Sequence, residues 1–285
     1  MDGYALGVSQ FTTWPWAFEQ DVAAYRRHGF SAIEVTEMKL DRARLDKQFE
    51  ALREAGLTVA SVQAKIHGIF PTKLQPEPAD PHARLELMKK SIESLAPYLP
   101  SGTPFVAITG AAPDGDLVRM HDTVVDALYK LSRFAGQRKM RIALEPLNPS
   151  LMNVDSALWS LYDAFEIVEE VGEANCGICL DTWNVWRDPD LRGLVRRAPD
   201  RLFLVQISDY RRPRAFYDRL VPGQGEIPLN EIIRAVHDAG YRRPYVIEIF
   251  SSESLQDSLW THNLDEVLAA SARGFQDVWE HAVTR

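Results

Sequence analysis

Short apolar runs alternate with amphipathic stretches from one end of the chain to the other. Eight of the runs have the length and composition of β-strands, and they are Tyr4–Gln10, Ala32–Glu37, Thr58–Ala64, Pro104–Gly110, Arg141–Leu147, Gly177–Trp183, Leu202–Asp209 and Tyr245–Ser251. Between the runs, apolar residues recur every three or four positions, as at Leu85, Met88, Ile92 and Leu95. This pattern predicts eight strands, each followed by a helix.

Strict alternation of strands and helices is typical of parallel strands joined by right-handed crossovers. Eight such units in 285 residues fit a closed (β/α)8 TIM barrel better than an open sheet. No G-x-G-x-x-G follows the first strand, and Gly223-Gln224-Gly225 has the position of a turn after the seventh. Without a low-complexity linker, we expect residues 1–285 to form a single domain of the α/β class.

Composition and charge limit the kinds of molecule that the protein is expected to bind. The chain is 46% hydrophobic and 25% charged, with a formal net charge of −8, which disfavours nucleic acid as a partner. No apolar run approaches the roughly 18 residues that a membrane span requires, and the first residues lack a secretion-signal pattern. We therefore expect a cytoplasmic protein that does not bind membranes, and a homo-oligomer or a partner subunit remains open.

The two cysteines have the C-x-x-C spacing of a redox motif, but they fall in a run that is predicted to be a strand. Cys176 and Cys179 are an odd number of positions apart, so a strand would direct their side chains to opposite faces of the sheet. We interpret them as small core residues.

Four consecutive strands in the second half of the chain end in, or contain, a polar side chain after an apolar run: Glu145, Asp181, Gln206 and Glu248. In a barrel the carboxyl ends of the strands converge, so these side chains would meet at one mouth. Burial of unpaired carboxylates is costly, and a shared divalent cation would offset that cost. An oxygen-only ligand set favours Mn²⁺ or Mg²⁺, with Co²⁺ as a further candidate, over zinc. The alternative is that each acid pairs with an Arg or Lys at the rim.

Further candidates lie near the ends of the earlier strands. His67 follows the third strand and is a candidate acid/base or hydroxyl-binding group, or else a loop residue that contacts a backbone carbonyl. Lys65 and Glu37 could bind substrate or pair with each other at the rim. Trp16 and Trp183 could form walls against the C–H faces of a sugar, and core packing is the alternative for both.

Five segments resemble a known family: ALEPLNPS, ICLDTWN, VQISDYRR, GQGEIPL and YVIEIF. Together they are similar to the xylose-isomerase-like barrel superfamily of sugar isomerases, ketose 3-epimerases and inosose-processing enzymes. The resemblance implies that Glu145, Asp181, Gln206 and Glu248 hold the catalytic metal. It also implies that Glu145 and Glu248 act as acid/base groups on either side of the reacting carbon, and that Arg212 binds substrate.

The sequence departs from the family pattern at two positions. The family usually has His where this chain has Gln206, and it often has D-x-x-H where this chain has Asn184. The expected chemistry is proton removal next to a carbonyl of a sugar, keto-sugar or cyclitol, through an enediolate that the metal stabilises.

Proton return to the same carbon would give epimerisation, and transfer between neighbouring carbons would give isomerisation. The same residues would also serve a lyase that acts on a 3-oxo sugar. Such a lyase would be a dehydratase, a decarboxylase, or a deglycosidase that eliminates from 3-oxo-glycosides.

Overall fold

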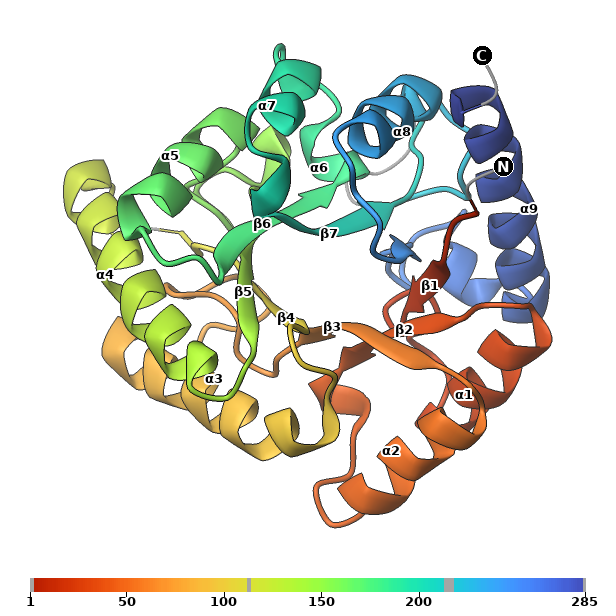
Figure 1. Ribbon diagram of the computed structural model, residues 1–285, viewed down its shortest axis with the longest axis horizontal. Helices are drawn as coiled ribbons and strands as arrows, with labels where there is room; N and C mark the ends of the chain where they lie inside the picture. The colour runs from red at the N-terminus through yellow and green to blue at the C-terminus, as the bar shows by residue number, and fades with distance from the viewer. Residues whose placement is uncertain (1–2, 112–113, 213–217, 284–285) are drawn as a thin grey trace.

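Eight parallel strands close into a barrel in sequence order, with β1 paired to both β2 and β8 (Figure 1). The computed structural model describes residues 3–111, 114–212 and 218–283. Within them the strands are β1 (Leu6–Ser9), β2 (Ala32–Thr36), β3 (Thr58–Gln63), β4 (Pro104–Ala107), β5 (Arg141–Leu144), β6 (Cys176–Asp181), β7 (Leu202–Ile207) and β8 (Tyr245–Ile247). This arrangement confirms the predicted TIM barrel.

Helices surround the barrel and cover the outer face of its sheet (Figure 1). They are α1 (Phe18–Arg27), α2 (Leu45–Glu54), α3 (Pro81–Leu95), α4 (Leu117–Gly136), α5 (Leu161–Val171), α6 (Thr182–Val185), α7 (Leu191–Arg197), α8 (Leu229–Asp238) and α9 (Leu264–Val283). The last helix, α9, packs against the chain just before β1, where the ring of Tyr4 lies 5.0 Å from those of Phe275 and Trp279. Among the described helices, none is long and apolar enough to cross a membrane.

Each strand ends earlier than the apolar run that predicted it. β6 also begins one residue before its predicted run, at Cys176. β5 stops at Leu144 and β8 at Ile247, each directly before a glutamate. The amides of these glutamates still donate to the neighbouring strands, from Glu145 to the Ala107 carbonyl and from Glu248 to the Ile207 carbonyl, both at 2.9 Å. The backbone thus fixes both glutamates where the chain leaves the sheet for the mouth of the barrel.

Apolar side chains fill the barrel below this mouth. A compact cluster of Val106, Ala143, Phe203, Leu204 and Val246 forms the interior layer together with Cys179, while Cys176 belongs to the larger core beneath the helices. The two cysteines therefore lie on opposite faces of β6, and both are buried and free. This placement confirms that they are small core residues.

The loop between β7 and α8 is organised around one buried carboxylate. The oxygens of Asp209 accept hydrogen bonds from the backbone amides of Tyr210, Gly223, Gly225 and Ile227, at 2.8–3.1 Å. A Cβ on Gly225 would lie 2.2 Å from the carboxylate, so only glycine allows this approach. The carboxylate of Asp209 therefore fixes the predicted turn at Gly223–Gly225.

Replacing Asp209 with alanine should leave these four amides without their acceptor. We expect Asp209→Ala to lower the free energy of unfolding by about 2–4 kcal/mol, since buried donors without partners cost roughly 1–3 kcal/mol. Urea unfolding followed by circular dichroism would measure the change. Asp200→Ala, which removes an exposed carboxylate before β7, is the matched control. Equal stability of the two variants would contradict this account of the loop.

Candidate functional site

Three carboxylates from the second half of the barrel converge at its mouth. Glu145 follows β5, Asp181 ends β6 and Glu248 follows β8, and one oxygen of each lies within 4.8 Å of the other two. All three are buried, with 6%, 0% and 4% of the residue exposed, respectively. The structure thus brings together three of the four side chains that the sequence nominated as metal ligands.

The fourth nominated ligand, Gln206, lies in the same cluster but turns its nitrogen toward the acids. Its Nε2 donates to Oε1 of Glu34 and to Oε1 of Glu248, both at 3.0 Å. Its Oε1 accepts a hydrogen bond from the thiol of Cys179 at 2.9 Å. In this orientation Gln206 acts as a hydrogen-bond donor that ties two carboxylates together across the barrel.

Glu34 is a member of the cluster that the sequence analysis missed. It lies in the middle of β2, is fully buried, and accepts a hydrogen bond from the Ser61 hydroxyl at 2.6 Å. A carboxylate within the otherwise apolar run AIEVT was the available signal. It is the same signal that singled out Glu248 in the apolar run Tyr245–Ser251.

Arg219 is a second residue that sequence reasoning missed, and it supplies positive charge to the cluster. Its Nη1 lies 2.7 Å from Oδ2 of Asp181 and 2.6 Å from Oε2 of Glu248. The guanidinium also lies over the ring of Trp183, 5.0 Å from its centroid. For two of the acids, the structure therefore realises the pairing with arginine that the sequence left open as an alternative.

Asn184 orients two of the acids and is itself held by Asn148. The Asn184 side-chain nitrogen donates to Oε1 of Glu145 at 2.7 Å and to Oδ2 of Asp181 at 3.2 Å. Its side-chain oxygen accepts from the backbone amide of Asn148 at 2.9 Å, which fixes the direction of the amide. The position where the family often has His is thus filled by a residue that links two acids.

Burial changes the protonation of the acids. It raises the pKa of Asp181 to about 7, although the charge of Arg219 opposes the shift. It likewise raises the pKa of Glu248 to about 7, again against Arg219. Burial, followed by the charges of Glu248 and Asp181, holds the pKa of Glu145 well above its usual range. Near neutral pH the cluster therefore holds protons that an exposed set of acids would release.

The candidates from the first half of the barrel lie in a separate network. Oε2 of Glu37 accepts from the Ser91 hydroxyl at 2.6 Å and from the backbone amide of Lys65 at 2.8 Å, and Oε1 pairs with Arg42 at 2.8 Å. Nδ1 of His67 donates to the Ala64 carbonyl at 3.0 Å. The ion pair of Glu37 is thus with Arg42, while the Lys65 side chain is exposed.

Burial lowers the pKa of His67, so its neutral form is favoured at neutral pH. With Nδ1 donating to the Ala64 carbonyl, Nε2 is the ring atom left to accept a hydrogen bond. None of the contacts of His67 in the described parts of the chain is with the acid cluster.

The remaining nominated residues differ in exposure. The Arg212 side chain is 71% exposed and lies 3.7 Å from Glu226. Trp16 is half-buried and packs against the core, whereas Trp183 is buried beneath Arg219. Arg212 is therefore open to solvent within the loop between β7 and α8.

Four half-buried aromatic rings form a wall on the β1 and β8 side of the mouth. Phe11 lies 5.6 Å from both Trp14 and Phe250, and Trp260 lies 5.3 Å from Phe250 and 6.3 Å from Trp14. Phe250 follows Glu248 by two residues along the chain, so the wall begins beside the acid cluster. We call these four residues the aromatic wall.

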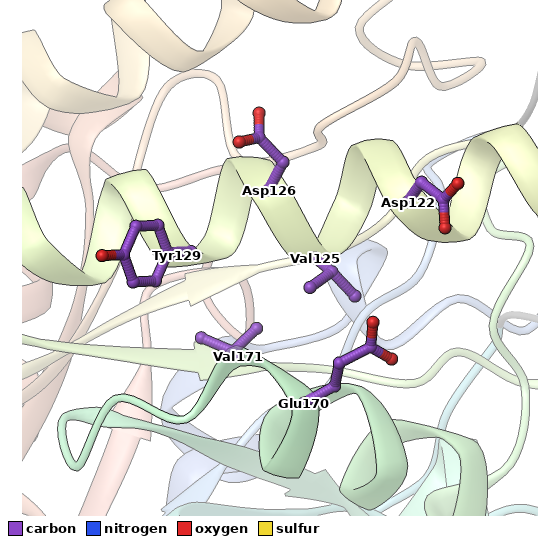
Figure 2. Close-up of a pocket in the computed structure, with 6 residues that line it drawn as sticks. All are labelled: Asp122, Val125, Asp126, Tyr129, Glu170 and Val171. Carbon is purple, nitrogen blue, oxygen red and sulfur yellow. The ribbon is translucent and has the colours of Figure 1, made fainter.

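A pocket of about 260 Å³ lies on the outer surface between α4 and α5 (Figure 2), away from the mouth. Its three acids are exposed, and each lies near a lysine or a histidine: Asp126 is 2.6 Å from Lys130, and Glu170 and Asp122 are 3.5 and 3.7 Å from His121. Exposed acids of this kind are an ordinary solvated surface. The buried cluster at the mouth is therefore the candidate functional site.

The fold and the cluster together define a class: a TIM barrel with buried carboxylates at the carboxyl ends of its strands, whose oxygens lie close enough together to hold a metal ion. The sequence matches the family described as xylose isomerase-like TIM barrel over residues 22–276. The chain belongs to that family, which confirms the resemblance inferred from the five sequence segments.

Relatives within the family include sugar and cyclitol isomerases and epimerases. An inosose isomerase of Bacillus velezensis is 23% identical over 246 residues, which cover 82% of this chain and 84% of the relative. A D-psicose 3-epimerase of Enterocloster bolteae is 29% identical over 124 residues, 43% of this chain and 38% of the relative. The crystal structure of the IOLI protein with a bound zinc atom superposes with a TM-score of 0.81 at 20% identity, covering 99% of this chain and 100% of that one.

The raised pKa values make stability depend on pH. The pKa values of Asp181 and Glu248 rise from about 4 in the unfolded chain to about 7 in the fold. Their contribution to stability is therefore greatest below pH 4 and is lost as the pH rises through 7.

In a chelating buffer, we expect the free energy of unfolding in urea to fall by on the order of 2 kcal/mol between pH 5.5 and 8. Glu248→Gln, which cannot ionise, should show a shallower decrease. A stability that is flat, or that rises with pH over this range for the wild type, would contradict the protonation of the cluster.

Proposed function

We propose that this protein is a divalent-metal-dependent isomerase or epimerase of a sugar, keto-sugar or cyclitol. The observation that carries the proposal is the buried cluster of Glu145, Asp181 and Glu248, with oxygens within 4.8 Å of one another. Membership of the xylose isomerase-like family, and similarity to an inosose isomerase and a D-psicose 3-epimerase, support the same class of reaction.

The donor set fits a hard divalent cation. With Glu34, the cluster contains four buried carboxylates, and Arg219 is the one cationic group among the described residues that contact them. Burial raises the pKa values of Glu145, Asp181 and Glu248, and for Glu145 the charges of Glu248 and Asp181 add to the effect. A divalent cation would favour the ionised form of all three acids.

Glu145, Asp181 and Glu248 would hold the ion. Gln206 would be the fourth ligand through Oε1, after a rotation of its amide that exchanges the oxygen with the nitrogen. Oxygen donors favour Mn²⁺ or Mg²⁺, with Co²⁺ also suitable. The IOLI protein, which shares this fold, has a bound zinc atom, and this supports metal binding by the family rather than one particular metal.

When bound, such a cation polarises a substrate carbonyl and makes the neighbouring C–H more acidic. Glu145 and Glu248 come from strands on different sides of the cluster and would act as the base and the acid. Their pKa values are raised by burial, and an acid/base group works best when its pKa is near the working pH. Asn184 orients the carboxylate of Glu145 through its hydrogen bond to Oε1.

The surroundings of the cluster suit a sugar-like substrate. The aromatic wall offers apolar faces against which sugar C–H groups pack, and it begins at Phe250, beside Glu248. Arg212 is exposed and would bind substrate oxygens from the β7–α8 loop. His67 would accept a hydrogen bond from a substrate hydroxyl at Nε2. Trp16, Lys65 and Glu37 are proposed as more distant parts of the rim.

Hydrogen–deuterium exchange tests the proton removal directly. We expect the Mn²⁺-loaded protein in D₂O to introduce deuterium next to the carbonyl of at least one member of a panel of ketoses, inososes and 3-oxo sugars. A chelator should reduce the exchange to background. Loss of water, CO₂ or an aglycone would assign a lyase instead, and no exchange with any substrate would overturn the proposed function.

Replacing either glutamate by glutamine should abolish the proton transfer while preserving the shape of the site. We expect Glu145→Gln and Glu248→Gln each to lower kcat/KM by about 10²–10⁴-fold, the usual contribution of a positioned acid or base. Glu166→Gln on the exposed face of α5 is the matched control and should retain full activity. Wild-type rates in both site variants, measured on the substrate found by deuterium exchange, would remove the glutamates from the reaction.

A further inference from the structure

Arg219 is held at the mouth by a segment that is fixed on both sides. Its backbone amide donates to the Phe250 carbonyl beyond β8 at 3.1 Å. The next residue, Leu220, pairs antiparallel with Asp209 beyond β7 through two hydrogen bonds of 2.9 and 2.7 Å. The residue before it, Asp218, accepts from the Ser251 hydroxyl at 2.7 Å. The backbone that carries Arg219 therefore bridges the ends of β7 and β8. These hydrogen bonds direct the Arg219 side chain into the acid cluster.

One nitrogen of Arg219 bridges two of the acids. Nη1 contacts Asp181 from β6 and Glu248 from β8 at 2.7 and 2.6 Å. These acids are two of the three side chains whose oxygens converge for a metal ion. A positively charged group shared by two carboxylates reduces their mutual repulsion, as a bridging metal cation would.

The guanidinium of Arg219 makes few hydrogen bonds apart from those to the two carboxylates. Nε of Arg219 is buried and has no hydrogen-bond partner among the described residues. Besides the two carboxylates, Nη1 contacts the backbone carbonyl of Glu248 at 3.2 Å, and the planar group lies over Trp183. Its attraction to the cluster therefore comes mainly from charge, which a divalent cation can replace.

We propose that Arg219 is the internal counter-cation of the metal-free protein and that it competes with the divalent metal for Asp181 and Glu248. This inference rests on the proposed metal-dependent function. Metal loading is then an exchange of cations: the ion takes carboxylate oxygens from the guanidinium, which stays over Trp183. The arginine stabilises the empty site and lowers the affinity of the metal.

Calorimetric titration with Mn²⁺ tests the competition. We expect Arg219→Met, which keeps an apolar stem over Trp183, to bind Mn²⁺ about tenfold more tightly than the wild type, equivalent to about 1.4 kcal/mol. Arg219→Lys, which keeps the charge but loses the planar group, should show a smaller increase. Arg212→Met removes an exposed charge that pairs with Glu226 rather than with the acids of the cluster, and its affinity for Mn²⁺ should equal that of the wild type.

Thermal unfolding supplies a second readout that does not depend on activity. In chelator at pH 8, Arg219→Met should unfold at a lower temperature than the wild type, because its buried acids have lost their counter-charge. Saturating Mn²⁺ should raise its unfolding temperature more than that of the wild type. If Arg219→Met is too unstable to titrate, the same comparison with Arg219→Lys decides the question.

The outcomes separate this inference from the proposed function. If the wild type binds Mn²⁺ and loss of Arg219 leaves the affinity unchanged or weaker, the competition is overturned while the metal site stands. An equal increase in Arg212→Met would also overturn it, because the effect would then be general charge repulsion. If neither the wild type nor any variant binds Mn²⁺, Mg²⁺ or Co²⁺, the metal-dependent function fails, and this inference fails with it.

Discussion

The constraint on which the site depends is an excess of negative charge buried at the carboxyl ends of the strands. Glu34, Glu145, Asp181 and Glu248 are all buried, while the described residues in contact with them include one guanidinium, that of Arg219. Carboxylates so placed must be protonated, hydrogen-bonded or neutralised by a cation. The amides of Asn184 and Gln206 hydrogen-bond to the acids, and the raised pKa values favour their protonated forms. Both reduce the cost of burying this negative charge.

The sequence predicted the barrel and the acids for the same reason. Apolar runs mark the strands, and a polar residue at the end of such a run has to lie at the mouth, because parallel strands share one direction. Glu145 and Asp181 were found in this way. Glu34 carried an equivalent signal inside β2, but it lies within the run rather than at its end, and its partner Gln206 is 172 residues away.

Other features could not have been predicted from local pattern. Arg219 lies in an irregular segment without strand or helix periodicity. Its position is set by its own hydrogen bond to the Phe250 carbonyl and by the pairing of Leu220 with Asp209. The partners of Glu37 are equally invisible to sequence, since one is the backbone amide of Lys65 rather than its charged side chain. Local periodicity specifies which face a residue occupies, whereas these contacts depend on how distant loops meet.

The acids are shared unequally between the two halves of the barrel. Glu145, Asp181, Gln206, Arg219 and Glu248 all come from β5 to β8 and their loops, and Glu34 is the member of this cluster contributed by the first half. The two hydrogen bonds from Gln206 to Glu34, at 3.0 and 3.1 Å, connect the two halves of the barrel within the acid cluster. A half-barrel fragment starting at β5 would thus possess nearly every reactive group, yet the amide of Gln206 would keep Glu248 and lose Glu34, the carboxylate that ties it to the other half.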